Sequence, residues 1–131
     1  MKKIEAFLRE ESLQNVKDAL RAIGIVGMNV HEVHGHGRQG GITLSWRGTS
    51  YQMDLLPKMQ LNIFLSDHNV EKTVETIMTA VRTGNGGKEG DGVIFVLPAE
   101  QVIRISTGER GQQALHYRGD IDDPSHAGED A

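Results

Sequence analysis

The chain has 131 residues, of which 37% are hydrophobic and 24% charged, as in an ordinary single globular domain. No apolar run approaches the roughly 20 residues needed to span a bilayer, which argues against an integral membrane protein. The formal net charge of −4 and the absence of a Lys/Arg stripe argue against a nucleic-acid binder.

The first 36 residues follow the pattern strand, helix, strand. Apolar and polar residues alternate over residues 2–9. No continuous apolar signal segment precedes this strand and the chain has no cysteine, so we expect a cytoplasmic protein. Ser12 is placed to cap a following helix and Gly24 to end it, and residues 25–36 predict a second strand. The apolar stripe of the helix consists of Leu13, Val16, Ala19, Leu20 and Ile23.

The same pattern repeats after residue 58. Alternation from Met59 to Leu65 predicts a strand, helical spacing from Val70 to Val81 predicts a helix closed by Gly84, and the apolar run 92–97 predicts a buried strand. Two tandem β-α-β units are typical of an α+β ferredoxin-like sandwich, β-α-β-β-α-β, with an antiparallel four-stranded sheet and two helices on one face.

Three segments lie outside these units. Residues 37–55, between strands two and three, form a connection long enough to indicate function, and its glycines predict little local structure. Residues 83–92 form a glycine-rich loop before the last strand. Residues 109–131 carry a net charge of −4 and few large apolar side chains, which predicts a flexible acidic tail on a domain of residues 1–108.

Motifs in these segments resemble the loops of the PII signal-transduction family. The long loop contains GHGRQ (35–39), WRGTSY (46–51) and LPK (56–58). The second loop contains TG (83–84) and GDG (90–92) followed by IF (94–95), and a third segment contains VIRI (102–105) and TGE (107–109). The resemblance covers residues 1–109, and its specificity comes from three motifs in order on the β-α-β-β-α-β pattern.

The resemblance implies a homotrimer that binds adenine nucleotide in the clefts between its subunits. In this family ADP alone, or ATP with Mg²⁺ and 2-oxoglutarate, sets the conformation of the long loop. The loop then binds or releases a membrane transporter or a metabolic enzyme, which is regulation by population shift and not catalysis. We therefore expect ADP, AMP or ATP as effector ligands and no catalytic residue.

The glycine-rich loop and two arginines carry the implied nucleotide site. Glycines let backbone N–H groups approach phosphate oxygens, and guanidinium groups present fixed donors. Without the resemblance, the glycines would only shape a turn and Arg104 would be an exposed strand residue. The nucleotide-binding candidates are Gly37, Arg38, Lys88, Gly90, Asp91, Gly92 and Arg104.

The long loop carries the other candidates. The resemblance implies a metabolite site in which Gln39 also ligates Mg²⁺, Gly41 allows close backbone approach and Lys58 neutralises a carboxylate. Partner-binding candidates are Trp46, Arg47 and Tyr51. Tyr51 aligns with a tyrosine that some bacterial members uridylylate, but Trp46 and Ser50 replace the usual Tyr and acid, which favours an unmodified, exposed or partner-contacting tyrosine.

Three departures from the family pattern bear on specificity. The second loop has three extra residues, Val93 replaces a usual lysine, and Ser106 replaces a usual second arginine. The lost charges predict that ADP or AMP binds at least as well as ATP, unless Lys88 replaces the missing lysine. The divergence leaves bicarbonate open as the small anionic metabolite in place of 2-oxoglutarate.

Two other functions stay open. The chain could be a ferredoxin-like metal-binding or structural trimer without nucleotide binding. Of His31, His34 and His36, however, strand periodicity places only the last two on one face, too few ligands for a metal site. An enzyme is least supported, because no nucleophile and base pair or carboxylate dyad stands out.

Overall fold

The computed structural model describes residues 1–35, 42–53, 56–82, 87, 91–115 and 117–123. Short 3₁₀ turns at Glu10–Ser12 and Asp67–Asn69 precede the two longer helices. The strands and α-helices, in chain order, are β1 (Lys2–Leu8), α1 (Leu13–Ala22), β2 (Asn29–Gly35), β3 (Ile42–Trp46), β4 (Thr49–Met53), β5 (Leu56–Leu65), α2 (Val70–Val81), β6 (Gly92–Pro98) and α3 (Gln112–Leu115).

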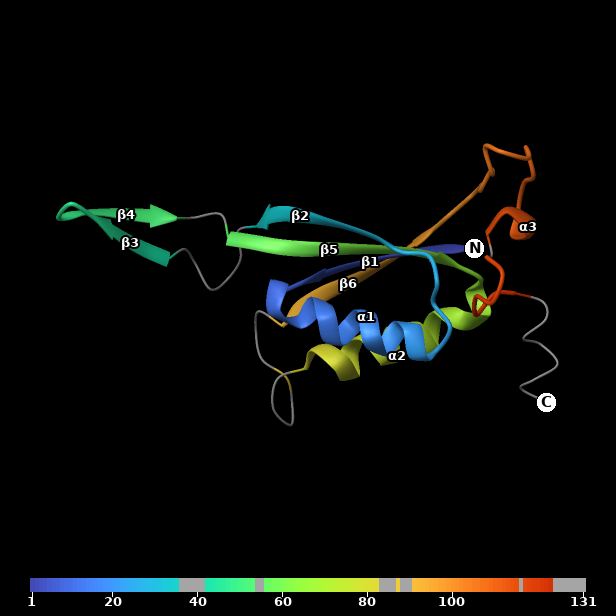
Figure 1. The fold of residues 1–131 in the computed structure, drawn as a ribbon, viewed down its shortest axis with the longest axis horizontal. Helices are drawn as coiled ribbons and strands as arrows, with labels where there is room; N and C mark the ends of the chain where they lie inside the picture. Colours follow the sequence, from blue (N-terminus) through green and yellow to red (C-terminus); the bar gives the residue numbers. More distant parts are fainter. Residues whose placement is uncertain (36–41, 54–55, 83–86, 88–90, 116, 124–131) are drawn as a thin grey trace.

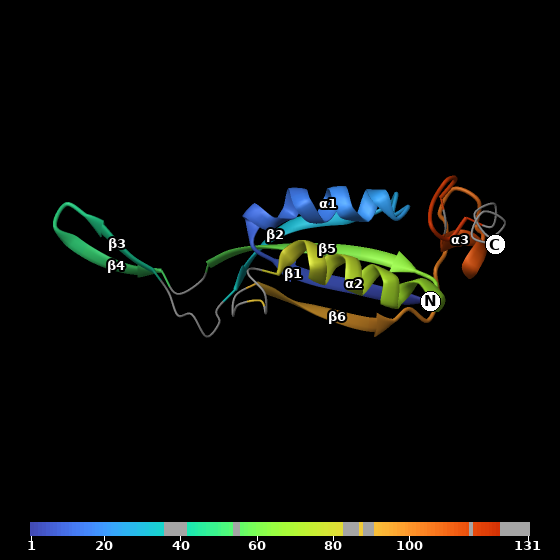
Figure 2. The ribbon, with the colours of Figure 1, turned by 90° about the horizontal axis from the view of Figure 1, so that it is seen from below.

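The main sheet has four strands in the order β2-β5-β1-β6, and every neighbouring pair is antiparallel. Ile4 of β1 lies opposite Ile63 of β5 and Val96 of β6. Helices α1 and α2 lie side by side on one face of the sheet (Figures 1 and 2). This arrangement confirms the predicted ferredoxin-like fold.

The core lies between the sheet and the two helices. Alternate residues of β1 and β5 point toward the helices and are buried, as the period-two pattern predicts. On the helices the buried residues recur at spacings of three and four, which makes each helix amphipathic. The fully buried side chains are Ile4, Leu8, Val16, Leu20, Leu61, Ile63, Leu65, Thr73 and Ile77.

The helix ends differ in part from the prediction. Gly24 follows α1 with a φ of +96°, and its N–H donates to the carbonyl of Arg21, so it ends the helix as expected. The predicted cap at Ser12 is wrong, because Ser12 is buried at the end of a 3₁₀ turn and its side chain makes no capping hydrogen bond. Helix α2 ends at Val81, and Gly84 lies outside the described residues.

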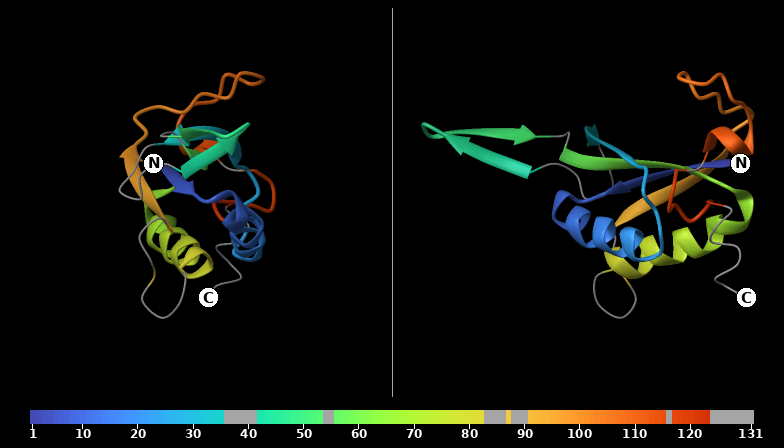
Figure 3. Two further views of the ribbon diagram at one scale, coloured as in Figure 1. Left: turned by 90° about the vertical axis from the view of Figure 1, so that its left-hand side faces the viewer. Right: turned by 45° about the vertical axis from the view of Figure 1, so that its right-hand side comes forward.

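The long loop contains a β-hairpin that the sequence reasoning missed. Strands β3 and β4 pair in register from Ile42 opposite Met53 to Trp46 opposite Thr49. The two turn residues, Arg47 and Gly48, have φ angles of 51° and 77°, and such left-handed pairs match the twist of a two-residue hairpin. The hairpin lies beyond the end of the main sheet (Figures 1 and 3).

Part of the predicted acidic tail packs against the domain. Ala114 and Leu115 of α3 are buried, as is the carboxyl-bearing Asp120. Ile121 packs against the core, and its N–H donates to the carbonyl of Gly24 at 2.7 Å. Ala114, Leu115, Asp120 and Ile121 thus pack against the rest of the domain, while the predicted flexibility of residues 109–131 stays a prediction.

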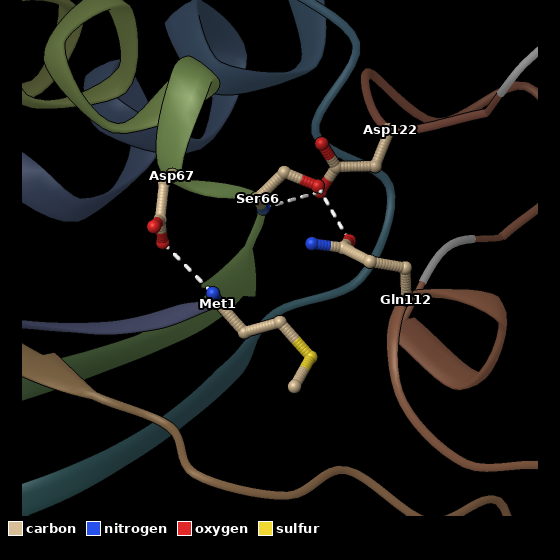
Figure 4. Close-up of polar contacts among 5 residues, drawn as sticks. All are labelled: Met1, Ser66, Asp67, Gln112 and Asp122. Atoms are coloured by element: carbon tan, nitrogen blue, oxygen red, sulfur yellow. Dashed lines mark hydrogen bonds and ion pairs between the residues drawn. The ribbon is translucent and has the colours of Figure 1, made fainter.

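Hydrogen bonds hold this C-terminal segment in place. A count of its apolar residues could not predict them. Asp122 accepts hydrogen bonds from the N–H of Ser66 at 3.0 Å and from Nδ2 of Asn69 at 2.6 Å. The hydroxyl of Ser66 donates to Oε1 of Gln112 at 2.8 Å (Figure 4). Next to them the N-terminal amine forms an ion pair with Asp67. Several carboxylates of the acidic segment thus serve as acceptors for backbone and side-chain N–H groups.

The part of the chain that the structure describes contains no helix long and apolar enough to cross a membrane.

The packing of this segment should depend on pH through Asp120. Burial raises the pKa of the Asp120 carboxyl above 3.8, against the opposing effect of the Val26 and Ile121 N–H groups. The folded state therefore binds more protons than the unfolded state, and packing should weaken as pH rises from 3.8 through the raised pKa. Native-state hydrogen exchange at the Ile121 amide measures this weakening.

Asp120→Asn should flatten that dependence, because the amide keeps an acceptor oxygen and does not titrate. Asp18→Asn, the same change on the exposed side of α1, should behave as the unmodified protein. Equal pH dependence in the unmodified protein and in Asp120→Asn would show that Asp120 does not control the packing.

Candidate functional site

The described part of the glycine turn before β6, Asp91 and Gly92, is held against the end of β1. Gly92 has a φ of +137°, and a Cβ atom there would lie 2.2 Å from the carbonyl oxygen of Phe7. Only glycine fits this position without moving the backbone. Glycine at position 92 was predicted to allow close approach to phosphate, and the contact with Phe7 adds a packing reason.

Asp91 fixes the same turn through an ion pair. Its Oδ1 accepts from Nη2 of Arg9 at 2.9 Å, and only 13% of the Asp91 side chain is exposed. The pair joins the end of β1 to the start of β6. Because the guanidinium faces this carboxylate, Asp91 holds the turn in place while the turn's backbone groups remain the candidates for phosphate binding.

A hollow of about 670 Å³ lies beside this turn, between α2 and β6. Most of its wall is apolar, and its polar end contains Arg82, Gly87 and Asp91. Arg82 was not among the predicted site residues, although a base directly after α2 and before the glycine-rich loop is a signal for it. The apolar lining residues are Leu8, Val74, Ile77, Met78, Val81, Val93, Ile94 and Val96.

Lys58 lies at the same end of the sheet as the glycine turn. It stands opposite Val33 on β2, one residue before Met59, and Met59 is in register with Leu8 and so with Gly92. Its side chain is half-buried at the base of the long loop. The structure thus brings the candidate for metabolite binding and the candidate turn to one edge of the molecule.

Several candidates lie outside the described residues or have side chains that are not described. The candidates outside the described residues are His36, Gly37, Arg38, Gln39, Gly41, Lys88 and Gly90. The candidates whose side chains are not described are Trp46 and Tyr51. Their assignments stay predictions, as does the Mg²⁺ site at Gln39. Arg47 is described and lies exposed at the hairpin turn.

Arg104 lies at the other end of the sheet from the glycine turn. It follows β6, whose seven residues separate its ends by roughly 20 Å at about 3.3 Å per residue. Figure 1 shows the turn after β6 beside α3, far from the start of β6. One chain therefore does not bring Arg104 to the Gly92 turn.

The described histidines of β2 do not converge. Nε2 of His31 lies 3.0 Å from Oε1 of Gln60, and Nε2 of His34 lies 3.8 Å from Oε1 of Glu32. Among the residues with described placement, no group of three or more His, Asp or Glu side chains could hold a metal ion.

Comparison with known proteins identifies the family. The family model described as "Nitrogen regulatory protein P-II" matches residues 1–109. The chain belongs to the P-II family. It is 49% identical over 115 residues to nitrogen regulatory protein P-II 2 of Methanothermobacter thermautotrophicus, covering 88% of this chain and 97% of the relative. It is 50% identical to the P-II protein of Cereibacter sphaeroides and 48% identical to that of Nostoc punctiforme, with 88% of this chain and 100% of each relative covered.

These findings confirm the resemblance and its general consequence. P-II proteins are non-catalytic regulators, so this chain is a signal protein of nitrogen regulation and not an enzyme. The P-II match ends at residue 109, and most of the C-terminal segment described above therefore follows it.

The close approach of Gly92 to Phe7 gives a stability prediction. Gly92→Ala should lower the free energy of unfolding by more than about 2 kcal/mol, because it combines a positive φ with a backbone clash. Gly108→Ala is the matched control, since Gly108 has a φ of +73° and no atom within 4 Å of an added Cβ. That control should cost only about 1–2 kcal/mol.

Urea unfolding of the two variants measures the difference. Equal losses of stability would mean that the Phe7 carbonyl does not constrain position 92.

Proposed function

We propose that this P-II protein senses adenine nucleotides and a small anionic metabolite in clefts between the subunits of a homotrimer. The observation that carries the proposal is the position of the candidate residues. The Gly92 turn and Lys58 lie at one end of the sheet and Arg104 lies past the other. A site that uses all of them needs residues from two chains.

The sheet offers a surface for such an assembly. The helices cover one face, and the opposite face exposes the aromatic and aliphatic side chains of Phe64, Phe95 and Leu97 by 41%, 50% and 38%. The rings of Phe7 and Phe95 meet edge to face on it, with centroids 5.9 Å apart. Contiguous exposed apolar side chains are typical of interaction surfaces. We infer that this face lies inside the trimer.

The glycine turn supports a phosphate-binding role. Asp91 is fixed by its ion pair with Arg9 and Gly92 by its contact with Phe7, so the N–H groups of these two residues need little ordering on binding. Arg82 adds a cation at the polar end of the adjoining hollow. A preorganised turn with a nearby guanidinium suits a nucleotide phosphate.

We also propose a metabolite site at Lys58 and a partner-binding role for the hairpin. Lys58 at the base of the loop suits a carboxylate or bicarbonate, which keeps 2-oxoglutarate and bicarbonate as the candidate metabolites. The hairpin beyond the sheet, with Arg47 exposed at its turn, suits contact with a transporter or a metabolic enzyme.

Nucleotide binding is the decisive test of this function. The unmodified protein should gain thermal stability with ADP and AMP at least as strongly as with ATP, because Val93 supplies no charge at a position where the family pattern has lysine. Absence of stabilisation by all three nucleotides would instead favour the structural or metal-binding trimer.

Val93→Lys should strengthen ATP binding. Val93 lines the hollow beside the glycine turn and is 49% exposed, so a lysine there can reach solvent and a phosphate. A charged hydrogen bond contributes about 1.5–3 kcal/mol, which solvent screening reduces to about half, or roughly three- to tenfold in affinity. Calorimetric titration with ATP and AMP measures the change.

Val30→Lys is a control with the same added charge on β2, away from this hollow. An equal gain in both variants would show a general charge effect and contradict the placement of the phosphate site at the Gly92 turn.

A further inference from the structure

A second hollow lies at the far end of the molecule, between the turn after β6 and the C-terminal segment. Its volume is about 430 Å³. Most of its lining follows the part of the chain that the P-II model matches. The lining residues are Arg104, Glu109, Gln113, Tyr117, Arg118 and Asp123.

The C-terminal segment holds the guanidinium of Arg104 in one orientation. Nη2 of Arg104 donates to the carbonyl of Ala114 at 3.1 Å, and the guanidinium carbon lies 5.2 Å from the ring centroid of Tyr117. Cation and ring contacts of this kind are favourable. An arginine fixed in this way loses less side-chain entropy when it binds a ligand.

Tyr117 is itself fixed by a glycine. A Cβ atom at Gly27 would lie 2.5 Å from Cε2 of Tyr117, so the ring occupies the space that any other residue would fill. Tyr117 lies in the sequence between Gln112 and Asp122, and both of these residues accept hydrogen bonds from Ser66 (Figure 4). The segment is therefore positioned by several independent contacts.

Arg118 adds a second guanidinium to the same hollow. It is exposed, and among the residues that the structure describes it has no hydrogen bond or ion pair. Two carboxylates, of Glu109 and Asp123, also line the hollow, and Oδ2 of Asp123 accepts from the N–H of Gly119 at 2.7 Å. The hollow is close to neutral as a whole, so a ligand would be bound by directed hydrogen bonds and not by net charge.

We propose that Arg104 and Arg118 together bind the terminal phosphate of a nucleoside diphosphate. Arg118 then takes the role that the family pattern gives to an arginine where this chain has Ser106. The inference rests on the proposed nucleotide-sensing function and adds a binding residue from outside the matched region. It also reduces the loss of ATP affinity expected from Val93 and Ser106, because Arg118 replaces one of the two missing charges.

Arg118→Gln tests the proposal. Calorimetric titration should show ADP affinity reduced about fivefold or more, while affinity for adenosine, measured by competition, stays unchanged. Arg110→Gln is the matched control, because Arg110 is an exposed arginine of the segment after β6, does not line the hollow and bonds only weakly to Gln101, at 3.4 Å between Nη1 and Oε1. It should leave both affinities unchanged. Ser106→Arg introduced into Arg118→Gln should restore ADP binding.

Four results would overturn the proposal. ADP affinity unchanged in Arg118→Gln would remove Arg118 from the site. Equal losses for ADP and adenosine would show a structural effect only. If inorganic phosphate bound as tightly as ADP, Arg104 and Arg118 would be a site for free anions and not for a nucleotide. An unmodified protein that binds no nucleotide would overturn the proposed function as well, whereas the first three results leave that function standing.

Discussion

The pairing of β1 with strands on both sides is the constraint on which the rest of the structure depends. β1 is hydrogen-bonded to β5 and β6 over its whole length, and its inward residues are fully buried beneath the helices. Its C-terminal end holds the glycine turn through the Phe7 carbonyl and through Arg9 just beyond it. The central strand of the core therefore also sets the position of the candidate phosphate-binding turn.

The same sheet separates the elements of the candidate site. Antiparallel pairing places the Gly92 turn and the base of the long loop at one end, and the turn after β6 with the C-terminal segment at the other. A rigid sheet cannot bend to bring these ends together. In the proposed trimer, assembly through the exposed apolar face would place the ligand site between chains, where binding can change both the loop and the contacts between subunits.

The fold was predictable from the sequence because its core follows simple periods. Alternation in β1 and β5 and helical spacing in α1 and α2 gave the right elements in the right order. The hairpin was missed because Arg47 before Gly48 is a weak turn signal and glycines nearby suggested an irregular loop. The packing of the C-terminal segment was missed because it depends on carboxylates such as Asp122 that accept N–H groups from distant residues. Arg82 and Arg118 gain their significance only from neighbours that are remote in sequence.

The central claim, that each nucleotide site is shared between two chains, is tested most directly by mixing two defective variants. Val93→Asp places a repelling charge beside the glycine turn, and Arg104→Gln removes the cation at the other end. Each variant alone should bind ADP weakly. After unfolding and refolding together, mixed trimers contain clefts that combine an intact turn with an intact Arg104, and calorimetry should show tight ADP binding in roughly one cleft in four. Tight binding that never returns in the mixture, although mixed trimers form, would contradict a site shared between chains.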